Sequence, residues 1–259
     1  MVTRDTAWPE GTPCWVDLGV SDIPKAIAFY SRLFGWDIPQ GPAEVGGYSV
    51  ASLDGRDTAG IGPKTGPAEA PSMWTTYLAS ADADATAQKV AKAGGALLME
   101  PMDVMEFGRM AVATDITGAV FGIWQGRAQT GFGLANAPGA VTWNEHFSRD
   151  FEGAKAFYAA VFGYEYGDMS SDSFTYATLL LPGHEVGGIG AYPAGTPDSV
   201  PSAWSTYFAT ADTDASVAAA VKAGGTVLRE AADSPYGRAA TVADDQGAAF
   251  SLISTPPGE

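Results

Sequence analysis

The stretch DIPKAIAFYSRLFGW at residues 22–36 returns later in the chain as DFEGAKAFYAAVFGY at residues 150–164. Two further segments repeat in the same way. WTTY at residues 74–77 returns as WSTY at residues 204–207, and DITG at residues 115–118 returns as DDQG at residues 244–247. The offsets are 128, 130 and 129 residues, which is the size of a domain and well above the roughly 20–50 residues of solenoid or propeller repeats. The sequence therefore predicts two homologous domains in tandem.

Each repeat alternates short strand-like segments with helical ones. Asp22 and Pro24 mark the start of a helix after a strand at residues 14–20, and Gly35 ends it. Two apolar segments around Asp54-Gly55 have the pattern of a hairpin. A second strand and helix follow at residues 74–79 and 82–93, and then strands at 96–99, 109–114 and 120–125. We expect domains at residues 10–127 and 140–255, joined by a linker rich in Gly, Ala and Pro at residues 128–139.

Composition excludes several classes of protein. The 259-residue chain has a net charge of −16, which disfavours nucleic acid and anionic membranes as partners. Its one cysteine, Cys14, allows no disulfide framework or thiolate metal cluster. No apolar run approaches the roughly 18–20 residues of a membrane-spanning helix, and residues 1–11 lack a signal-peptide pattern. We expect a cytoplasmic protein.

The ordered motifs resemble the vicinal oxygen chelate superfamily, which includes glyoxalases, extradiol dioxygenases, and bleomycin- and fosfomycin-resistance proteins. The resemblance lies in the helical segments from Asp22 to Trp36 and from Asp150 to Tyr164, the Gly-Arg pairs at 108–109 and 237–238, and the two Asp-x-x-Gly segments. The tandem form is similar to actinobacterial proteins labelled hydroxylases or glyoxalase-like. The resemblance implies an α+β fold in which paired βαβββ modules form a cup-shaped mixed sheet around a small-molecule cavity.

Enzymes of that superfamily usually hold a divalent metal with His, Glu or Gln from several strands. The corresponding positions here are occupied by Trp15 and Trp143, Thr76 and Thr206, and Gly122 and Ser251, with a fourth pair within residues 60–62 and 188–190. Indole, hydroxyl and glycine do not make a divalent site, and the same residue types are missing in both repeats. We therefore expect no metal and no cofactor.

Carboxylates stand beside the tryptophans on the first strand of each repeat. Because strand residues alternate between faces, Asp17 shares a face with Trp15, and Glu145 shares one with Trp143 and Phe147. A buried carboxylate needs a partner. One interpretation is structural, with backbone groups or an arginine such as Arg109 or Arg238 as the partner. The other is a ligand site or a general base. Glu145 is the stronger candidate, because Trp143 and Phe147 would exclude water on both sides.

The same alternation applies to the histidines. His146 points away from Trp143, toward the helices, and a one-residue shift in register would bring it to the site beside Glu145. His146 and Glu145 are therefore the two candidate catalytic residues. His184 lies in a turn and is expected to be exposed. Further aromatic and hydroxyl side chains are expected to line the cups. The predicted ligand-binding set is Trp15, Asp17, Tyr48, Trp74, Thr76, Trp143, Phe147, Phe174, Tyr176, Trp204 and Thr206.

Three functions remain open. The first is a metal-free protein that binds a planar or aromatic small organic ligand. The second is a metal-free enzyme, of lyase, isomerase or hydroxylase type, that uses Glu145 as acid or base on a quinone- or polyketide-like substrate. The third is a metal-dependent lyase or dioxygenase that uses His146 with Glu145. A monomer and a homodimer are both compatible with four modules in one chain.

Overall fold

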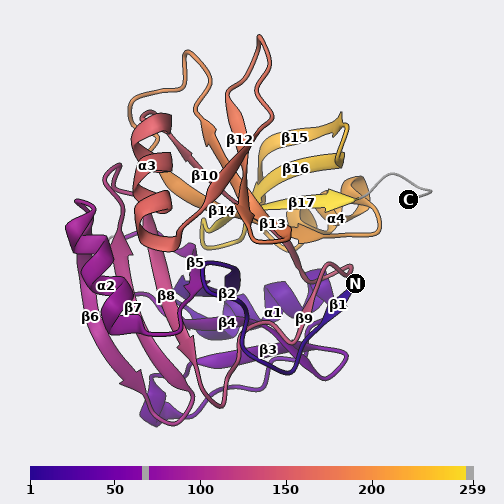
Figure 1. Cartoon of the computed structure of the whole chain (residues 1–259). Helices are drawn as coiled ribbons and strands as arrows, with labels where there is room; N and C mark the ends of the chain where they lie inside the picture. Colours follow the sequence, from indigo (N-terminus) through magenta and orange to yellow (C-terminus); the bar gives the residue numbers. More distant parts are fainter. Residues whose placement is uncertain (66–69, 255–259) are drawn as a thin grey trace.

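The computed structural model describes residues 1–65 and 70–254 and has two domains of mixed α+β structure, each built on one large curved sheet (Figure 1). In the first domain the strands lie in the order β3 (Ser49–Leu53), β4 (Arg56–Pro63), β2 (Pro13–Val20), β5 (Met73–Ala79), β8 (Val120–Gly126), β7 (Gly108–Thr114) and β6 (Ala96–Val104). A short 3₁₀ helix, η1 (Ala43–Val45), precedes β3. The predicted fold class is confirmed.

The second sheet repeats this order with one added strand. Its strands are β11 (Glu165–Asp168), β12 (Tyr176–Leu181), β13 (His184–Ala191), β10 (Val141–Ser148), β14 (Ala203–Ala209), β17 (Ala249–Ser254), β16 (Gly237–Ala243) and β15 (Thr226–Ser234). A two-stranded ladder of β1 (Val2–Thr3) and β9 (Leu134–Ala135) ties the N-terminus to the segment between the sheets. Residue 255, the predicted end of the second domain, lies outside the described residues.

Four α-helices are described, and each begins directly after an aspartate. These helices are α1 (Ile23–Phe34), α2 (Ala83–Lys92), α3 (Phe151–Phe162) and α4 (Thr213–Lys222). The capping side chains of Asp22, Asp82, Asp150 and Asp212 each accept a hydrogen bond from the backbone N–H three residues later. Gly35 and Gly163 end α1 and α3 in the left-handed conformation that glycine adopts without cost. The starts expected at Asp22 and Asp82 are confirmed.

The helices lie on one face of each sheet, where Leu18 and Ile61 pack with Phe29 and Tyr30 of α1. We call the opposite face, which bears Trp15 and Asp17 or their counterparts Trp143 and Glu145, the inner face. Cross-strand pairs place Tyr77 beside Trp15, and Tyr207 beside Trp143, on this face. No described helix is long and apolar enough to cross a membrane.

The helix layers of the two domains form shared cores. Helix α1 packs against α4, and α2 packs against α3. Phe208 of the second domain lies 4.9 Å from Phe34 and 5.2 Å from Trp74 of the first, measured between ring centroids. The Tyr30 hydroxyl donates to Asp244 Oδ2 across the same boundary at 2.9 Å. The domains are therefore joined by buried contacts as well as by the chain.

Candidate functional site: paired carboxylate–tyrosine clusters

The inner face of the second domain carries a polar cluster around Glu145, which is 8% exposed. Tyr207 donates its hydroxyl to Glu145 Oε1 at 2.5 Å, and Tyr176 donates to Oε2 at 2.8 Å. The indole N–H of Trp143 donates to the Tyr176 hydroxyl at 3.0 Å. Both carboxylate oxygens are thus occupied by phenols. The Tyr176 oxygen accepts from Trp143 and the Tyr207 hydroxyl is hydrogen-bonded to Ser251, so each phenol oxygen keeps one lone pair that can accept a further hydrogen bond.

The first domain has the same cluster with a shorter acid. Asp17 Oδ1 accepts from the Tyr48 hydroxyl at 2.5 Å and from the Trp15 indole at 2.8 Å. Tyr77 also hydrogen-bonds to Asp17. Tyr48 and Tyr77 are the repeat counterparts of Tyr176 and Tyr207, so an acid, a tryptophan and two tyrosines occur at matching places in both domains.

Burial sets the electrostatics of both acids. Desolvation raises the pKa of Glu145, although the hydroxyls of Tyr207 and Tyr176 and the charge of Arg229 act in the opposite direction. Desolvation likewise raises the pKa of Asp17 against the hydrogen bonds from Tyr48, Trp15 and Tyr77. The pKa values of Tyr176 and Tyr207 are raised by burial and by the nearby carboxyl, so both phenols stay protonated as donors.

The two clusters differ in access. In the first domain Trp15 and Tyr77 are buried, and Phe132 from the interdomain segment packs on Trp15 with ring centroids 5.8 Å apart. Trp8 holds Phe132 in place through a hydrogen bond of its indole to the Phe132 carbonyl at 3.1 Å. In the second domain Trp143, Tyr176 and Tyr207 all keep part of their surface exposed. The second cluster is therefore the more accessible of the two.

Cavities lie at two places. One, of about 310 Å³, opens beside Trp143 between the domains and is lined also by Trp8, Phe132 and Asn144. A larger hollow of about 490 Å³ lies at the start of α1, where Ser21, Pro24 and the glycine-rich residues near η1 line it. Only the smaller cavity touches the Glu145 cluster, and it does so at Trp143 alone, because Glu145, Tyr176 and Tyr207 do not line it.

Other predicted residues lie at the edge of the second site or on the opposite face. Phe147 stacks on Tyr192 at a centroid distance of 5.8 Å, and Phe174 is 46% exposed near Tyr176. Trp74 and Trp204 face the helices, where their indoles donate to Tyr30 and Tyr158 at 3.1 and 2.7 Å. Thr76 and Thr206 also lie on the helix side, and both donate to Asn144 Oδ1, at 3.0 and 3.1 Å. These last four side chains belong to the interdomain core.

His146 is fully buried on the helix side, on the face opposite Glu145. Its Nε2 lies 2.8 Å from Asp115 Oδ2, but the contact lacks the direction of a good hydrogen bond. Burial alone would raise the pKa of Asp115, yet the contact with His146 and the hydrogen bonds from Thr117 bring this pKa below its ordinary value. The shifted register that would pair His146 with Glu145 in one site is not the observed one.

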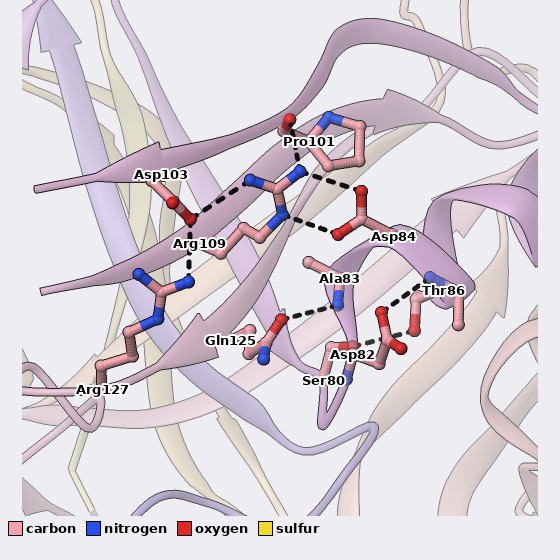
Figure 2. A network of polar contacts seen from close by, with 11 residues as sticks. Ser80, Asp82, Ala83, Asp84, Thr86, Pro101, Asp103, Arg109, Gln125 and Arg127 are labelled. Carbon is pink, nitrogen blue, oxygen red and sulfur yellow. Dashed lines mark hydrogen bonds and ion pairs between the residues drawn. The ribbon is translucent and has the colours of Figure 1, made fainter. Parts of the chain in front are cut away.

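Arg109 and Arg238 do not partner the buried acids, so the interpretation that they neutralise Asp17 and Glu145 is wrong. Figure 2 shows Arg109 held by Asp84, in two hydrogen bonds of 2.7 and 2.9 Å, and by Asp103 at 3.2 Å. Arg238 makes the same contacts with Asp214 and Asp233. Each arginine ties its sheet to the start of a helix, which is a structural role.

The clusters also do not fit a divalent metal. Zinc, iron and manganese sites are built from several imidazole, carboxylate or thiolate ligands, whereas each cluster offers one carboxylate, two phenols and an indole. A Cβ atom built on Gly188 would lie 1.7 Å from the Tyr176 hydroxyl, and one on Gly60 would lie 1.9 Å from that of Tyr48. The tyrosines thus fill the space into which a ligand side chain from β4 or β13 would project. Among the described residues, no group of three His, Cys, Asp or Glu side chains is placed to hold a metal ion.

Sequence reasoning missed Tyr77, Tyr207 and Arg229. The available signal was their position in the strand, because Tyr77 and Tyr207 directly follow the predicted residues Thr76 and Thr206. A β-bulge on the first strand of each domain, between Pro13 and Trp15 and between Val141 and Trp143, shifts the pairing. A one-residue shift moves a side chain to the other face of a sheet.

This chain belongs to the glyoxalase/bleomycin resistance protein/dioxygenase superfamily. The model of that superfamily matches residues 14–123, and a glyoxalase-like domain model matches residues 141–253. The chain is 41% identical over 260 residues to the "Putative glyoxylase CFP32" of Mycobacterium tuberculosis, covering 98% of both chains. It is 35% identical to the "Anthracycline biosynthesis protein DnrV" of Streptomyces peucetius, covering 98% of this chain and 96% of that protein.

Solved structures share the fold at much lower identity. The Mn(II)-bound glyoxalase from Novosphingobium aromaticivorans superposes with a TM-score of 0.66 at 15% identity, covering 95% of this chain and 83% of that one. The 2,3-dioxygenase LapB from Pseudomonas sp. KL28 gives 0.66 at 13% identity, with coverage of 96% and 95%. These likenesses support the tandem fold alone.

Proposed function

We propose that the protein binds a planar, hydroxylated aromatic molecule on the inner face of the second domain, without a metal. The observation that carries this proposal is the Glu145 cluster. A buried carboxylate holds two phenols in place beside a partly exposed tryptophan, at the edge of a cavity. Such a combination of aromatic surface and a few fixed polar groups is typical of small-molecule sites.

The cluster defines how the ligand would be held. Tyr207 and Tyr176 donate their hydroxyl protons to Glu145, so toward the ligand they act as hydrogen-bond acceptors. This arrangement favours a ligand that carries a hydroxyl group. Trp143, Phe147 and Tyr176 offer ring faces for a flat molecule. Relatives named for anthracycline biosynthesis support a polycyclic ligand of this kind.

The test uses alizarin, a dihydroxyanthraquinone, and follows quenching of tryptophan fluorescence. Tyr207→Phe removes one acceptor and is expected to weaken binding about tenfold, the upper end of the effect of one neutral hydrogen bond. The matched control is Tyr77→Phe in the first domain, which should leave binding unchanged because Tyr77 is buried there. Equal effects of the two substitutions, or no binding by the wild-type protein, would contradict the proposal.

A second candidate function is metal-free acid–base catalysis. It is favoured by the 2.5 Å contact between Tyr207 and Glu145, which gives a ligand hydroxyl a route to pass its proton through the phenol to the acid. Glu145→Gln separates the two functions: it should weaken binding modestly in both, but abolish chemical change of a bound substrate only if Glu145 takes a proton. Absorbance spectra of bound alizarin over time, compared between wild type and Glu145→Gln, provide the readout.

A further inference from the structure

One row of side chains crosses the inner face of each domain at the level of the tryptophan, and the two rows differ at their outer ends. In the first domain the row is Trp15, Tyr77, Gly122, Val112 and Met99. In the second domain it is Trp143, Tyr207, Ser251, Thr241 and Arg229. The two residues nearest the carboxylate are of the same type in both domains, while the outer three change from apolar to polar and cationic.

The polar row is continuous from the carboxylate cluster to Arg229. Ser251 lies opposite Tyr207 on the neighbouring strand, and its hydroxyl is 3.1 Å from that of Thr241. Arg229 pairs with Thr241 on β15. Neutral hydroxyls therefore connect the phenols to a guanidinium along the same side of the sheet.

Arg229 is an uncommitted cation in a strongly acidic protein. Among the parts of the chain that the structure describes, it is exposed and no salt bridge or side-chain hydrogen bond to it is found. Its charge favours the ionised form of Glu145. A chain with a net charge of −16 repels anions in general. A free arginine on the inner face would therefore attract an anionic group at that one place.

We propose that Arg229 binds an anionic substituent of the ligand, which makes the second inner face specific for planar molecules with a hydroxyl at one end and a negative charge at the other. This inference rests on the proposed function. The positions of Tyr207 and Arg229 are three strands apart in the sheet, which is about 14 Å at the backbone. That span matches a system of two or three fused rings. Guanidinium is suited to a carboxylate because its donors form a planar fork.

The test compares 6-hydroxyanthraquinone-2-carboxylate with its neutral 2-carboxamide by isothermal titration. The wild-type protein should prefer the carboxylate by about tenfold or more, the worth of one hydrogen bond to a charged group. Arg229→Met introduces the residue found in the first domain's row and should abolish the preference by weakening carboxylate binding about tenfold. Arg229→Lys should keep part of it. The preference of the wild type should also shrink with added salt.

The double variant Arg229→Met with Met99→Arg is the control for overall charge, because it restores the net charge but places the cation in the first domain. It should behave like Arg229→Met alone. Carboxylate preference that survives Arg229→Met, or that the double variant restores, overturns the assignment of Arg229. Equal binding of both probes by the wild type overturns it too, but leaves the proposed function standing. No binding of either probe overturns both. Arg229 is exposed, so its variants are expected to fold, as circular dichroism can verify.

Discussion

Glu145 and Asp17 show how a single buried acid is accommodated without a cation. Their negative charge is met by phenol and indole donors, and desolvation still dominates, so the pKa of each is raised above its ordinary value. Sequence alternation identified both acids and their neighbouring tryptophans. It could not identify the partners, because two of the four tyrosines come from strands whose register depends on a bulge.

The raised pKa of Glu145 predicts a pH-dependent cost to stability. Below the ordinary value of 4.5 the acid is protonated in both the folded and unfolded states, so no cost arises. As the pH rises through the folded-state pKa, the buried acid holds its proton more tightly than the unfolded chain does, and stability is lost. The glutamine in Glu145→Gln cannot ionise, so this variant does not lose stability as the pH rises through this range.

The free energy of unfolding of Glu145→Gln, relative to wild type, should therefore increase as the pH rises above the ordinary carboxyl pKa of 4.5. Urea unfolding at several pH values measures this difference. Glu152→Gln is the control, since that side chain is exposed on α3. A difference that stays constant across the range, or that falls with pH, would show that the buried acid carries no such cost.

At the scale of elements, strands β4 and β13 are glycine-rich because aromatic rings cross them. A Cβ atom on Gly188 of β13 would meet the Tyr176 hydroxyl at 1.7 Å, and one on Gly190 would meet the Phe147 ring at 2.4 Å. The sequence located these strands and the hairpins that contain them. It could not explain their glycines, because the reason lies in side chains from strands that are distant in the sequence.

Gly188→Ala is expected to destabilise the protein by about 1–3 kcal/mol, since the added methyl group must displace a tyrosine that is fixed by two hydrogen bonds. Tyr176→Ala in the same chain should remove the clash, so the double variant should be more stable than the sum of the single effects implies. Chemical denaturation of the four proteins gives the coupling. Strictly additive effects would mean that Tyr176 is not what Gly188 makes room for.

At the scale of the whole molecule, the helix layers merge the domains into shared cores. Phe208 and Phe250 of the second domain pack with Trp36 and Phe34 of the first. The repeat in the sequence predicted two domains, and their number and class are confirmed. The packing of the two domains against each other could not be predicted from the sequence, because an apolar helix face does not reveal which partner covers it. The predicted domain limits and the monomer-or-dimer question stay predictions.

The shared core predicts that both domains unfold together. Trp36→Ala should destabilise the protein by about 3–5 kcal/mol, because it leaves a cavity beside Phe208. Calorimetry should show one transition that moves as a whole to lower temperature. Two separate transitions, of which the substitution displaces only one, would show that each domain folds independently of this contact.

The crossed pairing of α1 with α4 and of α2 with α3 places the two halves in an approximately reciprocal relation, like the subunits of a symmetric dimer. In such a dimer, any substitution appears in both copies at once. Joining the halves in one polypeptide lifts that restriction, so Met99 and Arg229 can occupy equivalent places without compromise. Covalent linkage thereby allows one half to specialise while the other supplies the scaffold that supports it.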